Sequence, residues 1–167
     1  GVLFLQKGKG FSLAGATQII AFSEAFGIAG TVLAGWLSDN VFRGNRFVPV
    51  LISGLLCLLS LGAFLFTAGG YSLNIIYVSV FSLAIGVVYC TVAGLMALDI
   101  VPRKATGAAL GVVGLASYAA AGVQNIVSGV MIGGNDFNFA PVSVFWIVSC
   151  LLCFLIPLVS WKSLRRR

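Results

Sequence analysis

The sequence contains no histidine and only four acidic residues among its 167 positions. Histidine is a frequent metal ligand and general base, so its absence removes the simplest metal sets and catalytic pairs. Charged residues make up 8% of the chain, against about 25% in a typical soluble domain. A domain with so few charged residues cannot cover its apolar surface well enough to remain soluble in water. We therefore expect no enzyme active site, no metal site and no cofactor.

Cysteine is also scarce, and its four positions, 57, 90, 150 and 153, all lie inside apolar stretches. Cys150 and Cys153 form a C-x-x-C pair, a spacing that occurs at redox and metal sites. No histidine and no second pair of suitable spacing accompanies them. We favour the interpretation in which the cysteines are small apolar packing residues.

Apolar residues and glycine are abundant instead: 60% of the chain is hydrophobic and 21 residues are glycine. The mean hydropathy is +1.10. Five runs reach the length of about 20 residues that crosses a bilayer, and turn-forming residues separate them. We predict an all-α transmembrane fold with spans at 13–38, 47–68, 74–98, 106–132 and 142–161.

The formal net charge of +6 suggests nucleic acid as a partner, but the positions of the cations exclude it. Each lysine or arginine lies near an end of an apolar run, and those on one side are Arg43, Arg46, Arg103, Lys104, Lys162 and the arginines at 165–167. The positive-inside rule makes this side cytoplasmic. We expect a multi-pass protein of the cell (inner) membrane, with the lipid bilayer as its partner and a cytoplasmic C-terminus.

The start of the chain is consistent with a missing upstream part. The chain begins with Gly1 on the predicted outer side, and no signal peptide precedes it. Residues 1–5 are typical of the last turn of an apolar helix. We expect at least one further span before this chain.

The first predicted span carries Glu24 about midway along its length. A carboxylate at that depth is costly and usually faces a partner or a water-filled cavity. At helical spacing it shares a stripe of small and polar residues with Thr17, Ala21, Gly27, Thr31 and Gly35. We favour a cavity role for Glu24 over an ion-paired or protonated packing role between helices.

The fourth predicted span has a similar polar side. Glycines at 107, 111, 114 and 122 follow one stripe, which also carries Tyr118 and Asn125, with Gln124 beside it. We narrowly favour cavity lining over hydrogen bonding between helices for these three polar residues. Tyr89, in the third span, is an isolated candidate of the same kind.

The stretch after the first span reads Gly35-Trp36-Leu37-Ser38-Asp39 and continues to Arg43 and Arg46. It resembles the G-x-L-[SA]-D loop, with its following arginine, of the major facilitator superfamily. The resemblance implies that Asp39 pairs with Arg43 or Arg46, and with the helix N-terminus at Thr106, to hold one conformation. The simpler alternative is a helix-end turn with solvated charges.

Further matches narrow the resemblance. The Phe-Arg-Gly-Asn-Arg at 42–46 and the position of Glu24 are similar to those of the organophosphate:inorganic phosphate antiporters, which include glycerol-3-phosphate and hexose-phosphate transporters. The stretch from Asp99 to Gly107, followed by Tyr118, resembles their tenth-to-eleventh helix junction. The resemblance implies helices eight to twelve of a twelve-helix fold, without the N-terminal half and helix seven.

The resemblance also implies a function: a secondary active transporter that exchanges a sugar phosphate, with hexose 6-phosphate favoured, for inorganic phosphate by alternating access. Glu24 matches a carboxylate of the central charge network and Tyr118 a pore tyrosine. The two phosphate-binding arginines of the family lie on helices that this chain lacks. A glycerol-3-phosphate transporter and a membrane sensor of external hexose phosphate are the alternatives.

Overall fold

The computed structural model describes residues 1–42, 45–96, 101–133 and 137–164, and these are almost entirely helical. The long helices are α1 (Leu13–Trp36), α2 (Phe47–Phe66), α3 (Tyr71–Tyr89), α5 (Thr106–Ile132) and α6 (Ala140–Leu164). The short elements are the π-helical turns η1 (Phe4–Gly8), η2 (Leu37–Val41) and η3 (Cys90–Met96), and the 3₁₀ turn η4 (Arg103–Ala105).

Polar residues just before the apolar runs fix where several helices begin. Ser12 Oγ accepts a hydrogen bond from Gly15 N in the first turn of α1, at 3.1 Å. Asn45 Oδ1 and Asn138 Oδ1 accept from backbone N–H groups at the starts of α2 and α6, at 3.1 and 3.0 Å. Such caps satisfy N–H groups that have no partner inside the helix, so one side chain defines each start.

Helix α3 begins at Tyr71, three residues before the predicted start at 74. Gly70 is extended, and the Asn74 side-chain amide donates to the carbonyl oxygens of Gly69 (2.7 Å) and Gly70 (3.0 Å). The amide therefore stabilises the turn from inside the helix. Helix α6 likewise begins at Ala140, before the predicted 142, because Pro141 is compatible with a first helical turn.

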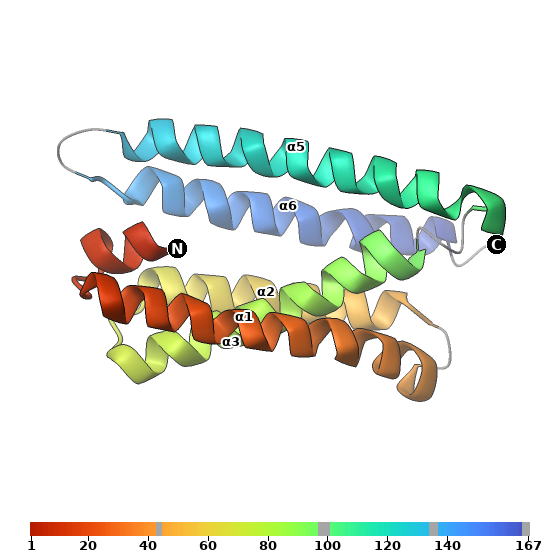
Figure 1. Cartoon of the computed structure of the whole chain (residues 1–167), viewed down its shortest axis with the longest axis horizontal. Coiled ribbons are helices and arrows are strands. Elements are labelled where there is room, and N and C mark those ends of the chain that lie inside the picture. Colours follow the sequence, from red (N-terminus) through yellow and green to blue (C-terminus); the bar gives the residue numbers. More distant parts are fainter. Residues whose placement is uncertain (43–44, 97–100, 134–136, 165–167) are drawn as a thin grey trace.

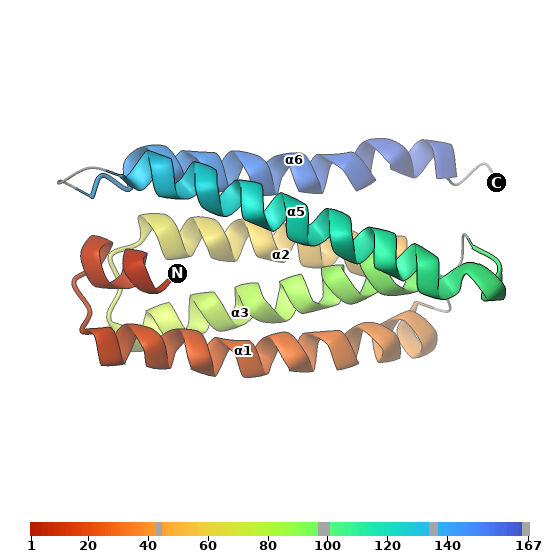
Figure 2. The same cartoon turned by 45° about the horizontal axis from the view of Figure 1, so that its top comes forward.

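The helices form two layers. Helix α3 packs between α1 and α2, and α2 packs on α6, which also contacts α5. Figures 1 and 2 show α5 and α6 together on one side of the group formed by α1, α2 and α3. The end of the bundle that contains η1 is called the η1 end here, and the opposite end, with η2, η3 and η4, is called the η2 end.

Within the part of the chain that the structure describes, four helical stretches are long and apolar enough to cross a membrane: Leu13–Val41, Phe47–Phe66, Tyr71–Leu95 and Arg103–Ile132. Ala140–Ile156 is a shorter apolar helical stretch. Large apolar side chains cover much of the outer surface, including Ile28 (69% exposed) and Val130 (75% exposed). Lipid suits such a surface because it replaces water as the solvent. The predicted all-α transmembrane fold class is confirmed.

Helices α1 and α3 touch through their backbones. A Cβ atom at Gly30 would collide with the Leu83 carbonyl oxygen, and one at Gly86 with the Gly27 carbonyl oxygen. Small residues allow this close approach in membrane proteins, where dispersion contacts rather than water drive helix association. The crossing of α1 and α3 therefore requires glycine at both positions.

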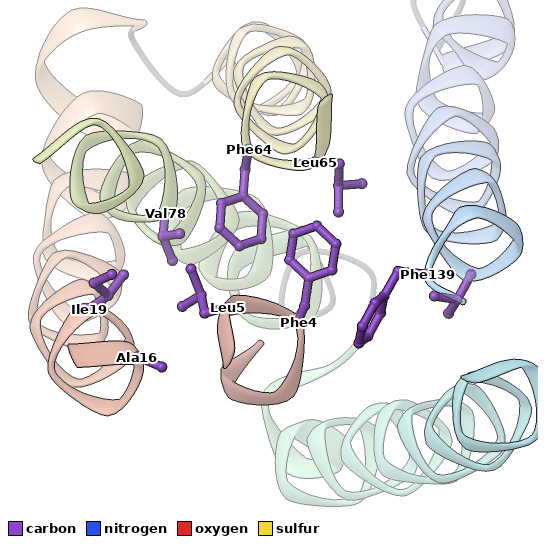
Figure 3. Close-up of a cluster of buried hydrophobic side chains, with 9 residues drawn as sticks. Phe4, Leu5, Ala16, Ile19, Phe64, Leu65, Val78 and Phe139 are labelled. Atoms are coloured by element: carbon purple, nitrogen blue, oxygen red, sulfur yellow. The ribbon is translucent and has the colours of Figure 1, made fainter. Parts of the chain in front are cut away.

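A cluster of buried apolar side chains lies at the η1 end (Figure 3). Phe4 and Leu5, from η1, stand among residues of the long helices. The Phe4 ring centroid lies 5.3 Å from that of Phe64 on α2 and 5.3 Å from that of Phe139, which precedes α6. The first residues of the chain are therefore part of the packed interior.

Candidate functional site

Glu24 lies near the middle of α1, and its side chain is exposed. Within the described residues its carboxylate makes no hydrogen bond or ion pair. The buried residues of α1 are Ala16, Ile19, Ser23, Gly30 and Ala34. The predicted stripe of small and polar residues coincides with this face only in part: Gly27 and Thr31 are half-buried beside Gly86 of α3, whereas Thr17 is exposed. Glu24 flanks the packed face and points out of it, because neighbouring helical residues are turned by about 100°.

The candidates on α5 are exposed. Tyr118 is 80% exposed, and Gln124 and Asn125 are also exposed. Ser128 is the buried residue of this helix, and its hydroxyl accepts a hydrogen bond of 2.9 Å from Trp146 Nε1 on α6. Among the described residues, nothing covers the predicted polar stripe: a Cβ at Gly111, Gly114 or Gly122 would meet no atom within 4 Å.

Tyr89 is the last residue of α3 and is 55% exposed. Val87, two residues earlier, is 2% exposed and lies inside the bundle. Glu24 and Tyr89 belong to the layer of α1 and α3, whereas the three α5 candidates belong to the other layer (Figure 2). The described residues do not close one pocket around all five, so their joint role in a cavity stays a prediction.

The gate motif lies at the η2 end. Gly35 is near the end of α1, and Asp39 is exposed on the π-helical turn η2. Arg46 is the half-buried residue that precedes α2. Arg43 lies outside the described residues. The start of α5 at Thr106 is at the same end of the bundle (Figure 1). The predicted pairing of Asp39 stays a prediction.

A shallow groove of about 590 Å³ runs beside α1 and α3 near the η1 end. Tyr71 Oη donates to Gln18 Oε1 across it, at 3.2 Å. The groove is lined by Gln18, Ala21, Phe22, Ala25, Tyr71 and Ile75. Ala21 of the Glu24 stripe lines it, but none of the five polar cavity candidates does, and its lining is mainly apolar. We assign it to the lipid-facing surface.

One polar network was not predicted. Lys9, just before α1, donates to Asn74 Oδ1 and to the Thr67 carbonyl oxygen (3.2 Å). Asn74 is fully buried. The signal in the sequence is an amide four residues after a Gly-Gly pair, inside an apolar run. Nothing local in the sequence connects that amide to Lys9, because 65 residues separate them.

The fold and these residues define a multi-pass α-helical membrane protein with an exposed carboxylate in one helix and exposed polar groups on another. A sequence model of the Major Facilitator Superfamily matches residues 1–125. The chain belongs to this superfamily. The predicted family is confirmed, and its members are transporters rather than enzymes.

Several curated proteins are similar to this chain, and three of them show the range of their names. The glycerol-3-phosphate transporter of Bacillus subtilis (strain 168) is 31% identical over 166 residues, which are 98% of this chain and 36% of the relative. The phosphoglycerate transporter protein of Salmonella typhimurium is 32% identical over 169 residues, 92% of this chain and 33% of the relative. The probable hexose phosphate transport protein of Chlamydia muridarum is 27% identical, over 96% of this chain and 35% of the relative. The chain spans about a third of the length of these curated relatives.

Proposed function

We propose that this chain is part of a secondary transporter that exchanges an organophosphate for inorganic phosphate by alternating access. One observation carries the proposal: relatives named for three different phosphate esters each match more than nine-tenths of the chain. Glycerol phosphate, phosphoglycerate and hexose phosphate differ in their carbon skeletons and share the phosphoryl group. That group is therefore the chemistry that the site must recognise.

Within this proposal, Glu24 acts on the protein's own charges and does not bind phosphate directly. A carboxylate repels a phosphate dianion, and the repulsion is strong where water is scarce. The sequence places no lysine, arginine or histidine deep in these spans. The cations that bind phosphate are therefore supplied by the rest of the complete transporter. Glu24 is a partner for those cations when the site is empty.

The relatives' names do not favour hexose 6-phosphate over the other esters. The relatives named for glycerol 3-phosphate and phosphoglycerate are at least as similar to this chain as the one named for hexose phosphate. Glycerol 3-phosphate and phosphoglycerate are equal candidates. In this proposal the protein lies in the cell membrane with the η2 end in the cytoplasm, because the arginines and lysines of the loops gather there.

The test uses the complete transporter polypeptide, reconstituted into liposomes loaded with inorganic phosphate. Radiolabelled glycerol 3-phosphate, 3-phosphoglycerate and glucose 6-phosphate are offered outside, and sulfate-loaded liposomes are the control. We expect uptake of at least one ester that depends on internal phosphate. Absence of exchange with every ester would refute the proposal. Saturable binding of glucose 6-phosphate without exchange would instead support the sensor alternative.

A further inference from the structure

Residues 4–11 come just before α1, and the first two of them are buried among the helices at the η1 end. Phe4 is 6% exposed and Leu5 is fully buried. The side chains that pack in the same cluster come from every long helix: Ala16 and Ile19 (α1), Phe64 and Leu65 (α2), Val78 (α3), Ile132 (α5) and Val142 (α6). Figure 3 shows Phe4 and Leu5 between the labelled side chains of α1, α2 and α3. The segment itself makes ring contacts with Phe64 on α2 and Trp146 on α6, and a hydrogen bond to Asn74 on α3.

Lys9 connects the segment to the turn between α2 and α3 through hydrogen bonds. Its ammonium donates to Asn74 Oδ1 and to the Thr67 carbonyl oxygen, and it lies 4.5 Å from the Phe64 ring centroid and 5.8 Å from that of Phe4. Burial lowers the pKa of Lys9 from its ordinary value. Neutral acceptors and ring faces are therefore what stabilise its charged form.

Asn74 makes this contact specific. The residue is fully buried, and its amide nitrogen already donates to the Gly69 and Gly70 carbonyl oxygens. Lys9 is the donor to its oxygen. Removal of that donor leaves a buried acceptor without a partner, which is costly. The segment or the turn must then move to satisfy the acceptor.

A second lysine joins the same segment to the other layer. Lys7 Nζ lies 5.5 Å from the Phe137 ring centroid, in the connection that leads to α6. Phe137 has a φ of 42°, a conformation that a bulky residue rarely adopts. Such strain persists where surrounding contacts hold the backbone in place. Gly10, with a φ of 75°, makes the turn near the end of this segment, just before Ser12 at the start of α1.

We propose that residues 4–11 are a clamp that holds the η1 ends of α2, α3 and α6 as one rigid unit, locked by Lys9. Because α1 begins at Leu13, four residues after Lys9, the lock also sets the position of α1, and with it that of Glu24. Lys9 is thus a positioning residue. Its role in transport rests on the proposed function, whereas the rigidity of the η1 end does not.

The rigidity is tested by distance measurement in the complete transporter, with its native cysteines replaced. Spin labels are placed at Ser72 on α3 and Ala140 on α6, which are both exposed, and the distance distribution is recorded by pulsed electron spin resonance. We expect Lys9→Met to broaden the distribution about twofold, whereas Lys9→Arg keeps it narrow because it retains charge and donors. Lys104→Met, an exposed lysine at the η2 end, is the matched control and keeps the parent distribution. A Lys9→Met distribution identical to the parent would overturn the clamp.

The positioning role is tested by exchange in the same proteoliposomes. We expect Lys9→Met to lower the turnover by about tenfold with KM changed less than about twofold, since a misplaced site slows the conformational step more than it weakens binding. Wild-type turnover combined with a broadened distance distribution would refute the positioning role of Lys9. If the parent protein exchanges no ester, the proposed function fails, and the distance measurement still decides the clamp.

Discussion

At the scale of single residues, Gly30 is the position where the packing of α1 leaves least room. A Cβ atom there meets the Leu83 carbonyl, which is backbone and cannot rotate away. We expect Gly30→Ala to lower the free energy of unfolding by about 1–3 kcal/mol, the usual cost of overpacking. Unfolding of the complete protein in mixed micelles with increasing SDS measures it.

Gly62→Ala is the matched control for this substitution. Its Cβ would meet only Ile147 Cδ1, at 3.8 Å, which is an ordinary contact. Alanine in a helix interior is favoured over glycine by about 0.5–1 kcal/mol, so this variant should unfold at the parent concentration of SDS or slightly above it. Equal stability of the two variants would contradict the backbone contact between α1 and α3.

Glu24 is the residue whose charge, not its packing, is expected to matter. Glu24→Gln keeps the shape and removes the charge of an exposed side chain, so the SDS unfolding midpoint should stay at the parent value. We expect the exchange rate in proteoliposomes to fall by about tenfold or more, because intramembrane carboxylates usually serve function. Parent-like exchange in Glu24→Gln would show that the carboxylate is only a tolerated surface group.

What the sequence reveals about single residues depends on how local the signal is. Glu24 and Asp39 are recognisable because each interrupts an apolar run or ends one. The partner of Lys9 is not recognisable, because its network joins residues that meet only after α3 folds back beside α1. A lysine near a span end is ordinarily taken for a topology signal, and here the same residue also forms the lock of the clamp.

At the scale of helices, the contact between α5 and α6 depends on the hydrogen bond from Trp146 Nε1 to Ser128 Oγ. Ser128 is the buried residue of α5 within the described chain, so few other α5 side chains contribute to the packing between α5 and α6. We expect Trp146→Phe and Ser128→Ala each to destabilise the protein, and the double variant to lose less than the sum. The coupling should be about 0.6 kcal/mol, the mean for interhelical hydrogen bonds in a membrane. Strict additivity in SDS unfolding would mean that the bond is not formed.

Helix starts and helix ends differ in how far the sequence predicts them. The starts of α1 and α2 follow from Ser12 and Asn45, whose side chains cap the next turn. The π-helical turns that follow α1 and α3 have no such marker in the sequence. Their backbone hydrogen bonds span one residue more than those of an α-helix, which turns the side chains to new directions, but the residue types are the same as in the α-helix before them. Tyr89 is the last residue before one of these π-helical turns. Helical spacing in the sequence therefore does not predict which face of the helix carries its side chain.

At the scale of the whole molecule, composition was enough for the fold class but not for the site. A chain with this much apolar surface and this little charge has few options besides a bundle of membrane-spanning helices. The site is different, because Glu24 and Tyr118 lie in separate layers and the described residues do not enclose the surfaces that carry them. The chain spans about a third of its relatives' length, so composition and local pattern alone do not place these two surfaces around one cavity.

The orientation of the bundle gives the last prediction. Single cysteines are introduced at Ser72, at the η1 end, and at Asn40 and Lys104, at the η2 end, which are all exposed positions. Loops rich in arginine and lysine are retained in the cytoplasm, so Ser72→Cys should react with a membrane-impermeant maleimide in intact cells. Asn40→Cys and Lys104→Cys should react only after permeabilisation. Labelling of Asn40→Cys and Lys104→Cys from opposite sides would be incompatible with helices that cross the bilayer side by side, because α1, α2, α3 and α5 bring both positions to one end of the bundle.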